Sequence, residues 1–196
     1  RMMQMLNEHA HKNRREAGVM PKIINNLEEN ILSAARRLVA EQGYAAVTMR
    51  AIAKECGIAV GTFYNYYPSK DAMLAACLLH DWQTALASAG ERTAAAQSAE
   101  EAVGAVFDAV RAFQEQNRSI FSDEGARSSA AGALQSRHAQ LQAQIAALLE
   151  APCRRFSDAP DAAFLAEFAA ESILSWSGTD ISFPQLWTLL KRLFIK

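Results

Sequence analysis

The stretch TMRAIAKECGIAVGTFYNYYPSK, Thr48–Lys70, contains an unusual concentration of aromatic residues. Four of them fall within five positions: Phe63, Tyr64, Tyr66 and Tyr67. Aromatic residues make up only 8% of the whole chain, so their gathering here indicates a local purpose. On a helical wheel of about 100° per residue, Phe63 and Tyr67 share one side with Val60. The spacing therefore predicts a short helix, over about 59–66, whose aromatic side is anchored in a core.

The opposite side of this helix is small at its start and polar afterwards. It carries Ala59, Gly61, Thr62, Asn65 and Tyr66. A face that meets only water is usually rich in charged residues, whereas small side chains let a helix approach a surface closely. The preceding segment, 49–56, is predicted to form another short helix with Thr48 as its N-cap, and Gly57 supplies a sharp turn between the two. This pattern is typical of a helix-turn-helix, whose second helix enters the major groove of DNA. The alternative, two packed core helices, leaves the polar face without a role.

Helical periodicity extends through most of the chain, and no segment alternates as a strand would. A helix that begins near Leu27 is expected to end at Gly43, and a long helix capped by Ser69 is expected to run to about Gly90. Behind them we predict four more helices, over about 98–113, 130–152, 161–177 and 184–195. Pro152 is expected to end the second of these, because proline lacks a backbone N–H. The predicted fold class is all-α, with an N-terminal three-helix helix-turn-helix domain and a larger helical-bundle domain.

The composition, with 51% hydrophobic and 21% charged residues, is ordinary for a folded soluble protein. No apolar run approaches the roughly 20 residues that span a bilayer, so no membrane partner is predicted. The three cysteines, Cys56, Cys77 and Cys153, form no CxxC motif, which argues against a disulfide framework or a metal site and fits a reducing cytoplasm. No Walker loop, dinucleotide-binding glycine fingerprint, HExxH or GxSxG motif occurs, so neither an enzyme activity nor a cofactor is predicted.

Charge is unevenly distributed along the chain. Residues 1–80 hold 10 Lys+Arg against 7 Asp+Glu, a net +3, whereas residues 81–196 hold 10 against 14, a net −4. A basic front and an acidic rear fit contact of the N-terminal part with a polyanion. The first residues are polar and aperiodic, and we expect a flexible N-terminal extension over 1–22 rather than a secretory signal.

The segment ILSAARRLVAEQGYAAVTMRAIAKECGIAVGTFYNYYPSKDAMLAA, residues 31–76, resembles the DNA-binding region of tetracycline-repressor (TetR) type regulators. The shared pattern is A-x-x-L-x-x-x-x-G-Y/F, then T-x-x-x-I-A-x-x-x-G, then G-T-F/L-Y-x-x-F/Y-x-S-K. The rest of the chain resembles the family only in length and helix order. The resemblance implies a helix-turn-helix DNA-binding domain over 23–68 and an effector-binding and dimerisation domain over 69–196, with the helix 69–90 as the connector.

The resemblance also implies which residues contact DNA. They are Thr48, Arg50, Ala59, Gly61, Thr62, Tyr64, Asn65, Tyr66 and Lys70. Tyr64 and Lys70 are expected to anchor on phosphates, which position a protein on the duplex without reading its sequence. Two positions depart from the family's usual pattern: Ala59 stands where a serine is common, and Tyr66 where a histidine is common. Which bases are read therefore stays open.

Two sets of apolar residues in the rear domain are candidates for other contacts. An apolar pocket between helices is predicted to be lined by Trp82, Phe107, Phe113, Phe121 and Trp176. A two-fold dimer interface is predicted to contain Phe164, Phe168, Trp187, Leu190 and Phe194. For both sets the plainer alternative is that they fill the core of one chain. Four polar residues are either surface groups or partners for a polar ligand: Arg111, Arg137, His138 and Glu171.

The sequence thus predicts a homodimeric TetR-type transcriptional regulator that binds pseudo-palindromic, double-stranded operator DNA. In the simplest form it is a repressor that a small apolar or amphipathic ligand releases from the operator. The alternative is a TetR-like DNA-binding protein without a small-molecule inducer, controlled by a protein partner or architectural in role. An enzyme on a helical scaffold has no supporting constellation of residues.

Overall fold

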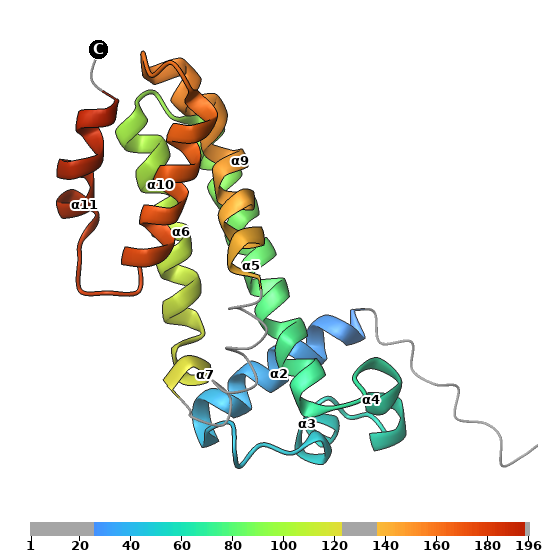
Figure 1. The fold of residues 1–196 in the computed structure, drawn as a ribbon. Coiled ribbons are helices and arrows are strands. Elements are labelled where there is room, and N and C mark those ends of the chain that lie inside the picture. Colours follow the sequence, from blue (N-terminus) through green and yellow to red (C-terminus); the bar gives the residue numbers. More distant parts are fainter. Residues whose placement is uncertain (1–25, 123–136, 195–196) are drawn as a thin grey trace, which may run out of the picture.

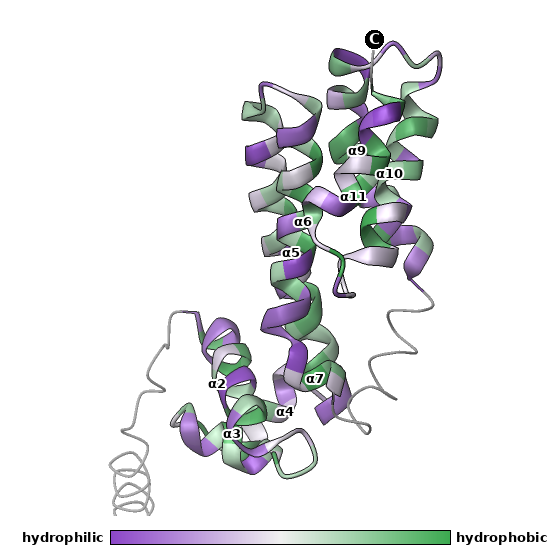
Figure 2. Cartoon of the chain, turned by 90° about the vertical axis from the view of Figure 1, so that its left-hand side faces the viewer, coloured by the Kyte–Doolittle hydropathy of each residue, from purple (hydrophilic) through white to green (hydrophobic). Residues whose placement is uncertain are grey.

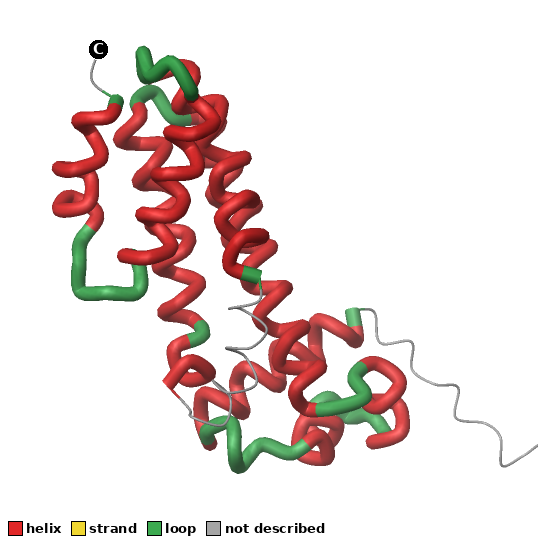
Figure 3. The backbone as a smooth tube through the Cα atoms, in the orientation of Figure 1, coloured by secondary structure: helices red, strands yellow, loops and turns green. Residues whose placement is uncertain are grey.

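The computed structural model describes residues 26–122 and 137–194, and these residues form helices and loops without a β-strand (Figure 1 and Figure 3). In chain order the helices are α2 (Leu27–Gln42), α3 (Met49–Glu55), α4 (Val60–Tyr66), α5 (Lys70–Ala95), α6 (Ala99–Gln116), α7 (Arg118–Ser122), α9 (His138–Phe156), α10 (Ala162–Trp176) and α11 (Phe183–Leu190). The predicted all-α fold class is confirmed. The predicted N-terminal extension, 1–22, and the first part of the helix predicted over 130–152 lie outside the described residues.

Helix α5 runs through both parts of the molecule (Figure 1). Helices α2, α3 and α4 gather around its first turns, and we call this group the head. The rest of α5 lies against α6 and α9, α10 packs along α9, and α11 packs on α6. We call this larger group the bundle. Figure 2 shows apolar stretches along the helices of the bundle where they face one another.

The head is held together by apolar side chains of α2, α3 and α4 that pack against one another. Ile31 and Val39 of α2 are buried, and so are Ile52 of α3 and Phe63 of α4. Each of these side chains lies on one side of an amphipathic helix, so their packing removes apolar surface from water, which stabilises the fold by about 25 cal/mol per Å². Ala53 is fully buried, and its small side chain fits the place where α3 and α4 meet.

The predicted helix ends near the head are confirmed. Thr48 and Ser69 each accept, through the side-chain oxygen, a hydrogen bond from the backbone N–H three residues on, over 3.1 and 3.0 Å. Asp161 caps α10 in the same way over 2.9 Å. Gly43, which follows α2, has a φ of 78°, a left-handed conformation that side chains disfavour. These caps bond backbone groups that the helix itself leaves unpaired.

Two helices of the bundle are longer than predicted. Helix α5 continues past Gly90 to Ala95, and α9 continues past Pro152 to Phe156. At Gly90, the position that a Cβ would occupy lies 3.5 Å from Leu148 of α9, so α5 and α9 pack closely here. Glycine destabilises a helix by only about 1 kcal/mol, and this packing offsets the loss. Pro152 is buried, and its ring packs in the core while the helix makes one more turn. Packing therefore outweighed both local breaking signals.

The last helix is shorter than predicted. The segment predicted as 184–195 is α-helical only to Leu190, and the residues Lys191–Leu193 tighten into a 3-10 turn. The turn places the ring of Phe194 beside that of Trp187, with the ring centroids 5.5 Å apart. Both rings are buried, so the chain end is folded back onto the bundle.

A partly buried ion pair joins the head to α5. Arg36 of α2 meets Asp81 of α5 through two contacts, Nη2 to Oδ1 at 2.6 Å and Nε to Oδ2 at 3.1 Å. The Asp81 side chain is 3% exposed and that of Arg36 is 23% exposed. Nearby, the Cys77 thiol donates to the Leu32 carbonyl over 3.8 Å, and burial raises the pKa of Cys77 to about 12. The thiol therefore stays protonated and acts as a small core residue.

We predict that Asp81→Asn lowers the free energy of unfolding by about 2 kcal/mol, because it leaves the Arg36 charge partly buried without a carboxylate. Urea denaturation followed by circular dichroism measures this change. Asp108→Asn is the matched control: its pair with Arg92, at 2.9 Å, is exposed on both sides, so its loss should cost at most about 1 kcal/mol. Equal losses in the two variants would contradict a structural role for the Arg36–Asp81 pair.

Candidate nucleic-acid interface and effector cavity

The turn between α3 and α4 sets the direction of α4. Gly57 has a φ of 66°, which a side chain would disfavour. The Ile58 N–H donates to the Ala53 carbonyl over 3.0 Å, and the Gly57 N–H donates to the Lys54 carbonyl over 3.1 Å. These two bonds are those of a Schellman motif, which ends a helix and redirects the chain sharply. The chain can then begin α4 at a steep angle to α3, which is the geometry of a helix-turn-helix.

The aromatic side of α4 anchors it to the head, as the sequence predicts. Phe63 is fully buried, Tyr67 is 5% exposed, and the two ring centroids lie 5.9 Å apart. The Tyr67 hydroxyl donates to Glu28 Oε1 of α2 over 3.1 Å. Burial, followed by the bond to Glu28, raises the pKa of Tyr67 well above its ordinary value, so the phenol stays protonated and keeps donating. The end of α4 is therefore held to the first turn of α2.

The other side of α4 faces solvent at the outer edge of the head (Figure 1). Tyr64 is 51% exposed and Tyr66 is 43% exposed. Ala59, Gly61 and Asn65 are exposed as well, whereas Thr62 is half-buried. A Cβ built at Gly61 would meet nothing within 4 Å, so the start of α4 presents bare backbone. The structure thus places the residues predicted on this face together, in a strip that is small first and polar afterwards.

Two more predicted contact residues flank this strip at the start of α3. Thr48 and Arg50 are exposed. The Thr48 oxygen accepts the capping bond described above, but a hydroxyl that accepts through its oxygen can still donate its hydrogen. Thr48 can therefore serve as both cap and donor.

Lys70 lies at the other flank, in contact with Tyr44. Its ammonium donates to the Tyr44 carbonyl and sits 4.0 Å from the centroid of the Tyr44 ring. The Tyr44 hydroxyl in turn donates to Asp71. The positive charge of Lys70 is therefore held at a fixed place beside α4, a constraint that the sequence alone does not reveal.

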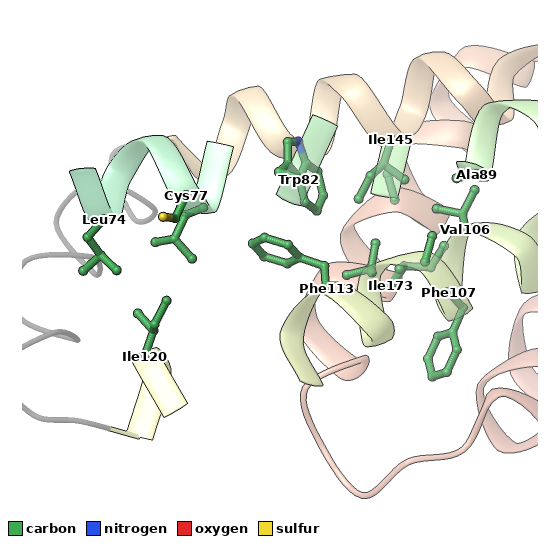
Figure 4. Packing of buried hydrophobic residues seen from close by; sticks show 14 of the residues in the cluster. Leu74, Cys77, Trp82, Ala89, Val106, Phe107, Phe113, Ile120, Ile145 and Ile173 are labelled. Carbon is green, nitrogen blue, oxygen red and sulfur yellow. The ribbon is translucent and has the colours of Figure 1, made fainter. Parts of the chain in front are cut away.

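A cavity of about 590 Å³ opens in the bundle on the side nearer the head. Its walls come from α5, α6, α7, α9 and α10 and from the loop after α10: Trp82, Val110, Phe113, Gln114, Arg118, Phe121, His138, Leu141, Leu174 and Gly178. Three of the predicted pocket residues, Trp82, Phe113 and Phe121, line it. Figure 4 shows the Trp82 and Phe113 side chains opposite each other, and their ring centroids are 5.3 Å apart. The volume falls within the range of small-molecule sites, about 300–1,000 Å³.

The other two predicted pocket residues lie elsewhere. Phe107 is 1% exposed and packs on Phe183, with the ring centroids 5.6 Å apart. Trp176 is 46% exposed on the surface of α10. Phe107 is one and a half turns before Phe113 on α6, so it points to a different side of the same helix. Aromatic content alone could not separate these faces.

Three polar side chains enter the cavity wall, and two of them were not foreseen. His138 is in the predicted polar set, and its Nε2 lies 2.9 Å from Glu171 Oε2. The hydrogen bond from His138 lowers the pKa of Glu171, so this carboxylate stays ionised and holds the imidazole ring. Gln114 and Arg118 were missed. They continue the stripe of Val110 at intervals of four residues, and that polar extension of an apolar stripe was the available signal.

The remaining members of the predicted polar set do not line the cavity. Arg111 donates to the Ile181 carbonyl over 3.2 Å, which ties α6 to the loop before α11. Arg137 is exposed just before α9.

The predicted dimer residues divide into two groups. Phe164 is 66% exposed and Phe168 is 47% exposed, and both lie on the outer side of α10. The others are buried within one chain: Trp187, Leu190 and Phe194. Helix α11 is amphipathic, and it turns these side chains toward α6 while Leu189, which is 68% exposed, faces outward. Trp187, Leu190 and Phe194 therefore fill the core of one chain, which is the plainer alternative for these residues.

Within residues 26–122 and 137–194, no group of His, Cys, Asp and Glu side chains is arranged to hold a metal ion. In the same ranges, every helix is too short or too polar to cross a membrane.

Sequence comparison connects the head to known proteins. Residues 31–77 match the family described as bacterial regulatory proteins, tetR family. The HTH-type transcriptional regulator UidR of Escherichia coli (strain K12) is 44% identical over 57 residues. That match covers 29% of this chain and 29% of UidR, so the chain shares less than a third of its length with this relative.

Structural comparison extends over most of the chain. A TetR-family transcriptional regulator from Streptomyces coelicolor has a TM-score of 0.59 and 20% identity, covering 86% of this chain and 99% of that one. The transcriptional regulator FadR from Bacillus subtilis, solved in complex with stearoyl-CoA, has a TM-score of 0.55 and 17% identity, covering 85% and 97%. At these identities the likeness concerns the fold, and both parts of the molecule share it.

Proposed function

The DNA-binding region of this chain belongs to the TetR family of bacterial regulatory proteins, and on this basis we propose that the protein is a dimeric transcriptional regulator. In this proposal it is a repressor of pseudo-palindromic operator DNA, from which a small molecule bound in the bundle releases it. The observation that carries the proposal is the exposed strip of α4, bare at Gly61 and polar beyond it, on a helix-turn-helix.

We propose that α4 enters the major groove with Ala59 and Gly61 closest to the duplex. Their small size allows close approach, and the Tyr64 hydroxyl then reaches a phosphate oxygen. Further along, Asn65 and Tyr66 extend toward base edges or phosphates. The half-buried Thr62 supports the same face, and at the flanks Thr48 and Arg50 meet the backbone on one side. Lys70, held at Tyr44, adds a fixed positive charge on the other side.

The proposed dimer uses the outer side of α10. Phe164 and Phe168 are one helical turn apart and strongly exposed, which is costly for a solvated surface and ordinary for a helical interface. A two-fold axis there, with α10 and α11 of both chains forming a four-helix contact, would carry two heads at a set separation. Two half-sites separated by about 34–36 Å, or a multiple, would then be bound together.

The proposed release of DNA begins at the cavity, which touches two connections to the head. Trp82 lines the cavity, and its neighbour Asp81 is paired with Arg36 of α2. Helix α7 also lines it, and α7 packs against α2. Ile120 of α7 is buried and lies opposite Leu74 and Cys77 of α5 (Figure 4). A ligand that moves α5 or α7 therefore bears on the head, and it releases DNA if it binds the DNA-incompetent state better, with a typical coupling of about 1–3 kcal/mol.

Control by a protein partner, or an architectural role, is the other candidate function. The cavity favours the small-molecule proposal over it, because about 590 Å³ lined by three aromatic rings and few polar groups matches a ligand site. FadR, which shares this fold, was solved with a small molecule, stearoyl-CoA, bound to it.

Gly61→Ala should separate stability from DNA binding. The new methyl group meets nothing within 4 Å, and alanine favours a helix. The free energy of unfolding should therefore rise slightly, by up to about 1 kcal/mol. Affinity for a duplex selected by the wild-type protein from native genomic DNA should fall about fivefold or more, because the methyl group crowds a close contact. Fluorescence anisotropy measures the affinity. Unchanged affinity would refute close approach at Gly61.

Tyr64→Phe and Arg50→Gln should weaken binding in distinguishable ways. Both should lower affinity for all duplexes alike, since phosphates carry no sequence information. Arg50→Gln should also reduce the slope of log K against log salt by about 0.9, because one fewer counterion is released, whereas the neutral hydroxyl of Tyr64 should leave the slope unchanged. Arg92→Gln is the control, because Arg92 lies in an exposed pair at the far end of α5. It should change neither the DNA affinity nor its salt dependence. A loss limited to one sequence would point to base contacts instead.

The double change Phe164→Ser with Phe168→Glu should convert the dimer to monomers in analytical ultracentrifugation, because a charge replaces apolar surface at the contact. Operator affinity should fall with dimerisation, since one head alone makes half the contacts. Leu79→Glu changes another exposed apolar residue, on α5, and should leave the mass unaltered. A dimer that survives the double change would place the interface elsewhere.

A further inference from the structure

The cavity in the bundle has two unlike sides. One side is aromatic and comes from Trp82, Phe113 and Phe121. The Trp82 indole N–H already donates to Gln144 Oε1 over 2.8 Å, so this residue adds apolar carbon to the wall. Phe113 stands edge-on between the other two, with its ring centroid 5.3 Å from that of Trp82 and 6.0 Å from that of Phe121. This side suits a planar or aliphatic apolar group.

The polar residues of the wall are two cationic or N–H donors, Arg118 and His138, and the amide of Gln114. Arg118 stands at the start of α7, and no carboxylate of the described residues lies within ion-pair distance of it. His138 stands at the start of α9 with its ring held by Glu171. Gln114 has a buried amide oxygen without a hydrogen-bond partner among the described residues. This oxygen is an acceptor, so a water or an N–H or O–H group can complete it, whereas a carboxylate can bind only the NH₂ group of the same amide.

Charge in the cavity wall runs opposite to that of its surroundings. Residues 81–196 carry 14 Asp+Glu against 10 Lys+Arg, yet no Asp or Glu is among the described residues that line the cavity. The contrast is sharp with a second groove of about 630 Å³ near the far end of α5, which Glu100, Glu101 and Asp108 line. Among the described residues, a cationic ligand would meet Arg118 and no carboxylate in the wall, since Glu171 lies behind His138 and is bonded to it. A wholly apolar ligand would displace water from Arg118 and Gln114 without replacing its bonds, which costs affinity.

We infer that the ligand of this cavity is an organic carboxylate, whose apolar body packs on Trp82, Phe113 and Phe121 and whose anionic head binds Arg118. This inference rests on the proposed function, which supplies the ligand site, and adds the chemical class. A guanidinium donates two parallel hydrogen bonds to a carboxylate, so Arg118 fixes both the charge and the orientation of the head. His138 and Gln114 line the same cavity, and the imidazole N–H and the amide NH₂ can donate to an anion.

In the inferred pose the ligand touches two helices that contact the head. Arg118 and Phe121 belong to α7, which packs against α2 of the head, whereas Trp82 belongs to α5. A carboxylate on Arg118 pulls on α7, and its apolar body presses on α5. One molecule then engages both connections from the cavity to the head, and the bond to Arg118 adds a polar contact with α7 to the apolar contact at Phe121.

The test uses matched compounds that differ only in the head group. Benzoate, naphthalene-2-carboxylate and decanoate are each compared with the corresponding carboxamide and amine, by isothermal titration calorimetry on the full chain. We expect at least one carboxylate to bind about tenfold or more tightly than its amide, with the amine weaker still, since bonds to a charged group are the stronger ones.

A variant of Arg118 tests whether this residue causes the preference for the carboxylate. Arg118→Gln should lose about tenfold or more of the affinity for that carboxylate while binding the amide as before. Arg92→Gln, an arginine outside the cavity, should change neither affinity. The midpoint of thermal unfolding of Arg118→Gln, measured without ligand, should match that of the wild type, which shows that the loss does not come from unfolding.

Several results would overturn the inference. These are an amide or amine that binds as tightly as its carboxylate, a carboxylate affinity that Arg118→Gln leaves intact, or no binding of any carboxylate at millimolar concentration. Anisotropy with the genomically selected duplex, run in parallel, keeps the two proposals apart. If an amine or amide released the DNA, the proposed function as a regulator would be supported and the inference of a carboxylate ligand would be refuted. If the protein bound no DNA, the proposed function as a regulator would be refuted. The calorimetric comparison would still decide whether the cavity prefers a carboxylate.

Discussion

The structure depends on one continuous helix that belongs to two cores at once. Helix α5 has 26 residues, about 39 Å at 1.5 Å per residue, and buries Met73 and Leu74 in the head and Ala89 in the bundle. Because the backbone hydrogen bonds of a helix are continuous, neither core can rotate about α5 without bending it or breaking side-chain contacts. The Arg36–Asp81 pair and the contact of α7 with α2 reinforce this constraint from the side.

The same constraint gives the exposed face of α4 its meaning. Phe63 and Tyr67 fasten α4 to α2 and thereby to α5, so the strip from Ala59 to Tyr66 has a defined direction relative to the bundle. A surface held in this way can be positioned by whatever holds the bundle, whether a second chain at α10 or a ligand between the helices. The proposed regulator therefore needs no flexible hinge, only a small displacement at one end of a rigid element.

Sequence reasoning succeeded where the signal is local. Thr48 and Ser69 cap helices as predicted because a capping hydrogen bond spans only three residues. Gly43 and Gly57 end helices for a reason that depends on their own φ angles. It failed where packing decides. Pro152 and Gly90 weaken a helix locally, but neighbours on α5 and α9 hold the helix through both positions. Phe107 was assigned to the pocket and Trp187 to the dimer interface, but both are buried within one chain. An aromatic residue fits a core, a pocket or an interface equally well until the rotation of its helix is known.

By itself, the sequence determined the all-α class, the helix-turn-helix and the exposed strip of α4, because periodicity, caps and glycine turns act within a few residues of the chain. Only the tertiary structure decided that Lys70 is held at Tyr44, that Arg36 pairs with Asp81, and that Arg118, Gln114 and His138 meet beside three aromatic rings. The first two contacts join residues 26 and 45 positions apart, and the cavity wall gathers residues from Trp82 to Gly178. They exist only once the helices have taken their places and their rotations about their own axes are set.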